Sequence, residues 1–168
     1  MRRSPPRWIT VFGLGSMRPA SGTWGSLPPV VVAAGLMLAG HGPSQSPWIY
    51  HATLATLFLV FCGACVFQGD AAEAHFGRKD PGNAVADEVA GQCLPLMFLP
   101  AVSVATPGAA AMTVFYAFIA FRILDIVKPW PARGLQRIPG GWGILIDDVV
   151  AGLYAAAVVQ IMSRVMLA

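Results

Sequence analysis

Long apolar runs alternate with short polar segments along this chain. Asp, Glu, Lys and Arg are all absent from three stretches, 19–69, 89–121 and 149–163. A membrane-spanning helix needs roughly 20 predominantly apolar residues, and the run 48–67 meets that length cleanly. Three further runs are shorter or less pure but can span with tilt, namely 89–105, 109–123 and 149–167. The pattern predicts an all-α, multi-helix membrane protein with four to five membrane-embedded helices.

A fifth apolar run, 27–39, is the weakest candidate for a span, because it would rise only about 20 Å as a helix. It would have to begin earlier, near Trp24, or be re-entrant. The alternative for the whole chain is a soluble helical bundle whose helices are unusually apolar. A length of 168 residues predicts a single domain, 1–168.

Composition favours the membrane over the soluble bundle. The chain is 56% apolar and only 11% charged, whereas soluble domains carry about 25% charged residues. The net charge of +3 comes from few basic residues, and these are interleaved with apolar runs. They fit anionic lipid headgroups better than nucleic acid, so we expect a membrane partner and no nucleic acid. The three cysteines are interpreted as small apolar residues.

Charged residues fall into three islands, 1–18, 70–88 and 122–148, with Arg164 apart from them. Two apolar runs separate each island from the next, so a chain that crosses twice returns to the side it left. All three islands therefore share one side, and their Lys and Arg content makes that side cytoplasmic. The last helix would end outside. This arrangement places all eight acidic residues on one membrane face.

Two acidic pairs, Asp87–Glu88 and Asp147–Asp148, each precede an apolar run. Capping of two helix starts is one interpretation. However, adjacent acids repel each other, and a divalent cation such as Mg²⁺ would relieve that repulsion and recruit phosphate. The segments "DEVAG" and "DVVAG" also echo each other, each with an acid four residues before a glycine. Small residues let helices pack closely, so we expect these two helix starts to pack near each other.

Two further segments suit a phosphate ligand. In "FRILDIVKPWP", Arg122, Asp125 and Lys128 recur every three residues, which offers two cations flanking one carboxylate. The alternative is a juxtamembrane basic segment that only sets topology. Residues 13–29 are rich in Gly, Ser and Thr and can cradle an anion with backbone N–H groups, or form a flexible loop. His75 is interpreted as a loop-edge histidine rather than a general acid or base.

Three blocks together resemble the phosphatidylglycerophosphatase A family: "GLGSMRPASGTWGS", "KDPGNAVADEVAGQ" and "FRILDIVKPWPARGLQRIPGGWGILIDDVVAGLYAA". The resemblance implies a mostly helical, Mg²⁺-dependent enzyme of the bacterial inner membrane. Its active site would face the cytoplasm, and it would hydrolyse the terminal phosphate of phosphatidylglycerophosphate to give phosphatidylglycerol. The family also includes soluble relatives in which a central helix is surrounded by others. The resemblance therefore argues for fewer membrane spans than the apolar runs alone suggest. Gln136 stands where relatives carry an acid, so it is given no metal role.

The resemblance also implies roles for residues. Metal ligands would be Asp80, Asp87, Glu88, Asp147 and Asp148, which join Asp125 as the catalytic set. Phosphate-binding residues would be Arg122, Lys128, Thr23, Gly25 and Ser26. Attack by water and attack by an aspartate both remain open. A small transporter or channel subunit with an acidic cation site is the alternative function, and a structural membrane protein is another.

Overall fold

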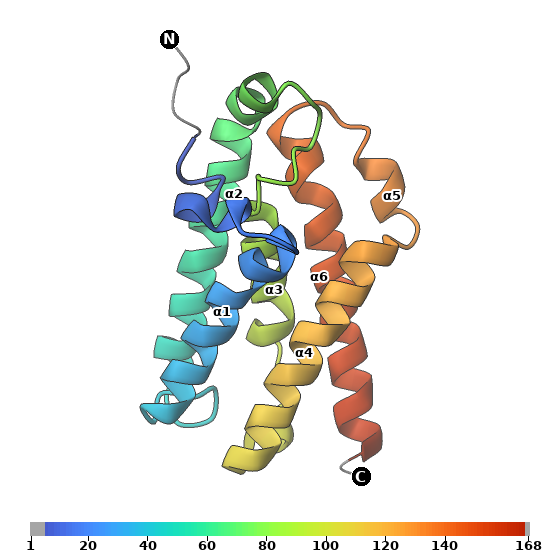
Figure 1. The fold of residues 1–168 in the computed structure, drawn as a ribbon. Coiled ribbons are helices and arrows are strands. Elements are labelled where there is room, and N and C mark those ends of the chain that lie inside the picture. Colours follow the sequence, from blue (N-terminus) through green and yellow to red (C-terminus); the bar gives the residue numbers. More distant parts are fainter. Residues whose placement is uncertain (1–5, 167–168) are drawn as a thin grey trace.

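The structure is a computed structural model that describes residues 6–166, and within that range every regular element is a helix. The elements are η1 (Val11–Ser16), α1 (Ser21–Leu38), α2 (Pro47–Phe76), α3 (Ala86–Met97), η2 (Ala101–Val104), α4 (Pro107–Val127), α5 (Ala132–Leu135) and α6 (Gly141–Met166). Figure 1 shows four long helices, α1, α2, α4 and α6, arranged around the shorter α3. The all-α prediction is confirmed.

Local sequence sets where the long helices begin and end. Helix α2 has Pro47 in its first turn and ends at Gly77, which adopts the left-handed conformation with φ 68°. Helix α4 begins after Thr106, whose side chain accepts a hydrogen bond from Ala109 N at 3.2 Å. It ends where Lys128 takes a left-handed φ of 46°. The turn that follows α4 thereby carries Lys128 back toward the bundle.

Four helices are long and apolar enough to cross a membrane, Ser21–Leu38, Pro47–Phe76, Pro107–Val127 and Gly141–Val165. This confirms the prediction of several membrane-spanning helices. The weak run 27–39 is the second part of α1, which gains its length by beginning at Ser21. Much of the glycine-rich segment 13–29 is thus helical and not a flexible loop. Helix α6 likewise begins earlier than the predicted 149, at Gly141.

The prediction of a spanning helix over 89–105 is wrong. Helix α3 has 12 residues, so it is only about 18 Å long. It is buried at nearly every position because α1, α2, α4 and α6 all pack against it. The run is apolar because protein surrounds it, and Pro100 follows soon after the helix ends at Met97. Helix α3 is therefore the core of the bundle.

The charged islands meet at one end of the bundle, as predicted. In Figure 1 the segment around η1 and the α2–α3 and α4–α6 connections lie at the same end, opposite the last turns of α6. Hydrogen bonds join these segments: Ser21 Oγ donates to Gly82 O at 2.6 Å, and Asn83 Nδ2 donates to Gly15 O at 3.1 Å. Arg2 and Arg3 of the first island lie outside the described residues.

Candidate active site

No carboxylate of α3 caps the start of this helix. Its N-cap is Val85, and no side chain caps the helix. The backbone carbonyl of Ile9 instead accepts hydrogen bonds from Val85 N at 2.9 Å and Ala86 N at 3.1 Å. Because another segment supplies the cap, Asp87 and Glu88 are left free for a different role. The interpretation of this acidic pair as a helix cap is therefore wrong.

The second acidic pair does not cap a helix either. Helix α6 begins at Gly141 and has no acid in its first turn, so Asp147 and Asp148 lie well inside the helix. Both are buried, with 1% of each residue exposed. A carboxylate at such a position cannot reach the free N–H groups at the helix start. The two aspartates therefore need partners from other helices.

Helices α3 and α6 touch at two glycines, and this crossing brings the acids together. A Cβ atom on Gly91 would lie 2.7 Å from Asp148 O, and one on Gly152 would collide with Gly91 O. Gly91 follows Asp87 by four residues and Gly152 follows Asp148 by four, so each acid lies one helical turn from the contact. The predicted packing of the two echoing segments is confirmed, although the second lies inside α6 rather than at its start.

Three carboxylates converge beside this crossing. One oxygen each from Asp87, Glu88 and Asp148 lie within 4.8 Å of one another. Asp87 is only 6% exposed, and each of the three side chains has a buried oxygen without a hydrogen-bond partner among the described residues, namely Asp87 Oδ1, Glu88 Oε2 and Asp148 Oδ2. We call these three residues the acidic cluster. Its unpaired oxygens face a free-energy penalty that a ligand could remove.

Burial and mutual repulsion disfavour the charged forms of the α3 acids. Burial raises the pKa of Glu88 to about 8. It also raises the pKa of Asp87 well above its usual range, and the neighbouring Glu88 charge adds to the effect. Such a cluster must either take up protons or hold a cation. Mg²⁺ binds through carboxylate oxygens and water, so the donor set and its unpaired oxygens fit this ion.

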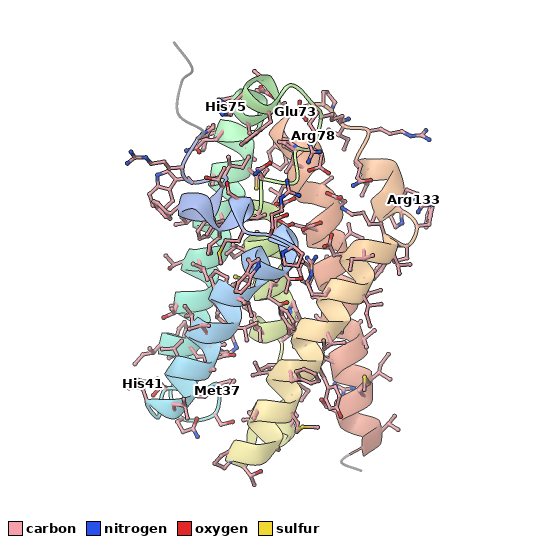
Figure 2. The ribbon with its side chains drawn as sticks, viewed as in Figure 1. Met37, His41, Glu73, His75, Arg78 and Arg133 are labelled. Atoms are coloured by element: carbon pink, nitrogen blue, oxygen red, sulfur yellow. The ribbon has the colours of Figure 1, made fainter. Side chains whose placement is uncertain are left out.

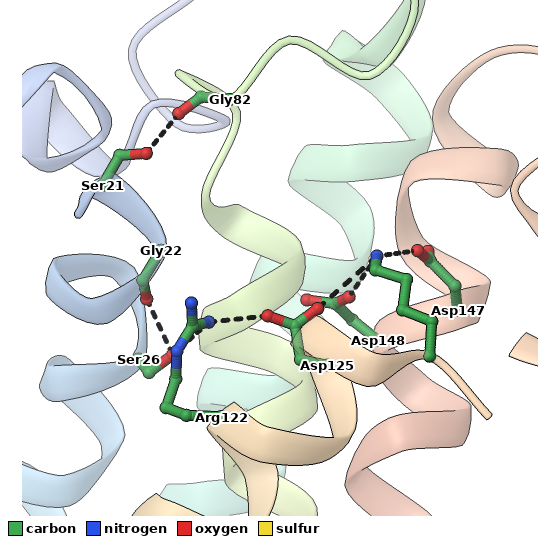
Figure 3. A network of polar contacts seen from close by, with 9 residues as sticks. Ser21, Gly22, Ser26, Gly82, Arg122, Asp125, Asp147 and Asp148 are labelled. Carbon is green, nitrogen blue, oxygen red and sulfur yellow. Dashed lines mark hydrogen bonds and ion pairs between the residues drawn. The ribbon is translucent and has the colours of Figure 1, made fainter. Parts of the chain in front are cut away.

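Arg122 lies next to the acidic cluster, held by both α1 and α4. Figure 3 shows its guanidinium between Ser26 and Asp125: Nη1 donates to Asp125 Oδ2 at 2.7 Å and to Ser26 Oγ at 3.3 Å. Ser26 Oγ in turn donates to Gly22 O at 2.8 Å. A Cβ on Gly22 would lie 2.6 Å from Glu88 Oε1 and 2.8 Å from Arg122 Nη2. Gly22 therefore lets α1 approach both charged groups.

Lys128 neutralises the other side of the site. Its Nζ forms an ion pair with Asp147 and lies 3.4 Å from Asp148 Oδ1 and 3.5 Å from Asp125 Oδ1. Burial alone would lower the pKa of Lys128, but Asp148 and Asp147 outweigh burial, so this pKa is raised. One ammonium group is thus shared among three carboxylates. Asp148 links Lys128 to the acidic cluster.

The five predicted metal ligands fall into two groups. Asp87, Glu88 and Asp148 form the acidic cluster, whereas Asp147 pairs with Lys128. Asp80 is half-buried in the loop between α2 and α3, and its backbone N donates to Glu73 Oε1 at 3.2 Å. Burial raises the pKa of the Asp80 carboxyl, while the Lys128 charge lowers it. Asp80 is not among the carboxylates whose oxygens converge in the cluster.

The predicted phosphate-binding residues of α1 also differ in position. Ser26 is fully buried and contacts Arg122. Gly25 allows a close helix contact instead, since a Cβ there would lie 2.7 Å from Val85 Cβ. Thr23 is half-buried on the same helix. His75 lies near the end of α2, on the outside of the bundle (Figure 2), with its ring 4.8 Å from that of Phe76.

Two residues at the site were missed in the sequence. Gly22 was hidden inside a segment interpreted as a loop, although its spacing of four from Ser26 is the spacing of one helical face. Gln92 is fully buried on α3, and neither of its amide atoms has a partner among the described residues. It follows Glu88 by four residues and so lies on the same helix face. A buried polar residue one turn after an acid is the signal that could have found it.

Comparison with known proteins gives the chain a family. The phosphatidylglycerophosphatase A family matches over residues 8–163. Phosphatidylglycerophosphatase A of Haemophilus influenzae is 33% identical over 153 residues, which cover 88% of this chain and 82% of the relative. The Escherichia coli protein of that name is 42% identical over 83 residues, covering 49% of this chain and 44% of its own length.

A third relative carries a different name. A putative phosphatidylinositol-3-phosphatase of Bacteroides thetaiotaomicron is 34% identical over 109 residues, which are 65% of each chain. No solved structure matches the chain. The three blocks that suggested the family in the sequence lie within the matched range, and the structure brings most of the acids of the second and third blocks together with Arg122 and Lys128. The chain belongs to the phosphatidylglycerophosphatase A family and is a phosphatase enzyme.

Proposed function

We propose that the chain hydrolyses the terminal phosphate monoester of phosphatidylglycerophosphate to give phosphatidylglycerol, and that this reaction depends on Mg²⁺. One observation carries the proposal: three carboxylates, each with a buried oxygen that has no partner among the described residues, converge next to a guanidinium held in place by two helices. The names of two relatives support the substrate. Acidic residues confined to one end of the bundle favour an enzyme over a channel, because a permeation path needs acids at several depths.

Arg122 is the residue we assign to the phosphate. Its Nε has no partner among the described residues, and a guanidinium can donate two parallel hydrogen bonds to phosphate oxygens. Asp125 and Ser26 position it. Lys128 adds a second positive charge that lowers the repulsion between the substrate and the surrounding carboxylates. Asp147 is assigned to positioning Lys128.

Asp87, Glu88 and Asp148 are the residues that would hold Mg²⁺. When bound, the ion supplies positive charge to the phosphate oxygens and makes water a stronger nucleophile. The chain's own contribution is to keep the three carboxylates together at the Gly91–Gly152 crossing and to keep bulk water away by burial. Preorganised charges in a buried site stabilise the developing charge of the transition state strongly.

Water is the nucleophile in this proposal. A bond forms between the water oxygen and phosphorus, and the bond from phosphorus to the glycerol oxygen breaks. The glycerol oxygen takes a proton, so the products are phosphatidylglycerol and inorganic phosphate. An acid quench of the reaction with ³²P-labelled substrate tests this step. No label should remain on the protein, and a stable phosphoenzyme would show that an aspartate attacks instead.

Phosphate release from the purified protein tests the function. Phosphatidylglycerophosphate should be hydrolysed in the presence of Mg²⁺, hydrolysis should stop with a chelator, and added Mg²⁺ should restore it. Phosphatidylinositol 3-phosphate is the informative second substrate because one relative is named for it. Asp148→Asn should abolish release, while Asp70→Asn, at an exposed acid of α2, should leave it unchanged. Release that persists in chelator would contradict the Mg²⁺ requirement.

We infer further that the chain resides in the bacterial inner membrane with the site toward the cytoplasm. The positive-inside rule supports this, because the described segments that carry the basic residues of the three islands lie at the end of the bundle that holds the site. In intact cells, a membrane-impermeant thiol reagent should label Ser44→Cys, in the exposed α1–α2 connection, and not Lys79→Cys. Labelling only at position 79 would reverse the orientation.

A further inference from the structure

The acidic cluster reaches the protein surface at the half-buried Glu88 and at Arg122 beside it. Asp87 and Asp148 are almost completely buried, whereas 15% of the Arg122 side chain is exposed. On the side of α1, the neighbours of Arg122 are Ser26 and the backbone of Gly22, which carries no side chain. The line of contact between α1 and α4 at these residues, which we call the α1–α4 seam, is therefore where a phosphate can approach the cluster.

An exposed apolar stripe of α4 leads to this seam. Phe115, Ile119 and Ile126 precede or follow Arg122 by seven, three and four residues, so all four share one helix face. The three apolar side chains are 54%, 36% and 71% exposed. Helix α4 is long and apolar enough to cross a membrane. We call Phe115, Ile119 and Ile126 the outer stripe. Arg122 lies on the same helix face, between Ile119 and Ile126.

We propose that the phospholipid substrate reaches the site sideways from the bilayer, with its glycerol backbone and acyl chains on the outer stripe and its terminal phosphate passing through the α1–α4 seam to Arg122. The inference rests on the proposed function. Charge complementarity identifies the occupant, because an apolar surface that carries a half-buried guanidinium matches a lipid with an anionic headgroup. Phe115 lies about 10 Å along the helix from Arg122, the depth at which the acyl chains would begin.

A cavity beside α4 does not fit this substrate. A cavity of about 180 Å³ lies between α4 and α6, lined by Met112, Tyr116, Val159 and Met162 among others. No charged side chain lines it, and its lining comes from the first turns of α4 and the last turns of α6, away from Arg122 and Asp148 near the other ends of these helices. A phosphate placed there would meet no cation. The outer stripe is the apolar surface of α4 that is continuous with the site.

Photocrosslinking tests the proposal directly. Benzoylphenylalanine replaces Phe115 in one variant and Phe67 in a matched control, which is an exposed phenylalanine of α2 on the other side of the bundle. Each full-length protein is placed in phosphatidylcholine vesicles that contain a labelled, non-hydrolysable phosphonate analogue of phosphatidylglycerophosphate. The analogue should crosslink at position 115 about tenfold more than at position 67, since a charge-assisted contact to phosphate favours residence at the stripe by that order.

The variant Arg122→Ala completes the experiment. Combined with benzoylphenylalanine at position 115, it should reduce crosslinking to the level seen at position 67. Equal yields at positions 115 and 67 would overturn the inference, and so would enrichment that survives Arg122→Ala. A wild-type protein that releases no phosphate yet shows the Arg122-dependent enrichment would disprove the proposed function and leave the lipid path standing.

Discussion

Gly91 of α3 and Gly152 of α6 lie against each other, so close that a Cβ on Gly152 would collide with the carbonyl oxygen of Gly91. Each glycine follows an acid of the cluster by one helical turn. The contact therefore fixes the distance between the carboxylates of Asp87 and Asp148. A sequence feature that looks like helix packing is thus also what assembles the site.

Gly152→Ala should damage both stability and activity. The added methyl group forces α3 and α6 apart, and overpacking of this kind lowers the free energy of unfolding by about 1 to 3 kcal/mol. Phosphate release should fall more steeply than stability, because the two halves of the acidic cluster separate. Gly63→Ala on α2 is the control, since the nearest atom to its Cβ is 3.8 Å away. Unchanged activity in Gly152→Ala would mean that the crossing does not set the site.

Gly22→Ala should reduce activity with little loss of stability. The new Cβ would lie within 3 Å of both Glu88 Oε1 and Arg122 Nη2, and both side chains can move to accommodate it. Their displacement should lower kcat/KM by about tenfold to a hundredfold, the effect expected for misplaced reacting groups.

Gly35→Ala on the same helix provides the matched control, since nothing lies within 4 Å of its Cβ. It should keep full activity and raise the free energy of unfolding by about 0.5 to 1 kcal/mol, because alanine favours helix more than glycine does. Equal kcat/KM values for the two variants would refute the role of Gly22.

Without metal, the protein should lose stability as the pH rises. Folding raises the pKa of the Glu88 carboxyl from its ordinary 4.5 to about 8, so the folded state binds this proton more tightly than the unfolded state. The free energy of unfolding should therefore fall as the pH rises from 4.5 to about 8. Thermal unfolding in chelator measures this slope, and Glu88→Gln should flatten it while Asp70→Asn should not. A stability that rises with pH in chelator would contradict the buried-cluster account.

Lys128→Met should destabilise the protein strongly. The variant leaves Asp125, Asp147 and Asp148 buried without their shared ammonium group. Removal of one partner from a buried ion pair lowers the free energy of unfolding by about 3 to 5 kcal/mol. The additional change Asp147→Asn should restore part of this loss. Lys79→Met, at an exposed lysine, is the control, and denaturant unfolding in detergent that gave identical midpoints for both single variants would refute the network.

The sequence predicted the helices well where lipid contact and protein burial impose different patterns, and poorly where they look alike. The run that contains α3 is as apolar as a membrane span, yet α3 is a short central helix. Helix α1 was underestimated because "SGTWGS" reads as a loop by composition, although its glycines serve close contacts with Val85, Glu88 and Arg122. Apolar periodicity cannot tell lipid from neighbouring helices as the partner.

For the site, residue type and spacing were enough to select the acids. They were not enough to tell which acids form the acidic cluster and which lie outside it. Asp147 and Asp148 are neighbours in sequence and both contact Lys128, yet only Asp148 also joins Asp87 and Glu88, because successive residues of a helix point about 100° apart. The backbone cap from Ile9 carries no signal in the sequence, since any residue can offer a carbonyl. That cap is nevertheless what frees the α3 acids.

Equilibrium binding of Mn²⁺, followed by electron paramagnetic resonance with Mg²⁺ as competitor, tests the central claim most directly. The wild-type protein should bind Mn²⁺ and release it to Mg²⁺. Asp148→Asn should weaken binding by at least about tenfold, since it removes a charged oxygen donor from the cluster, while Asp70→Asn should bind as the wild type does. Equal affinity in wild type and Asp148→Asn, or no binding by the wild type, would contradict a metal site at Asp87, Glu88 and Asp148.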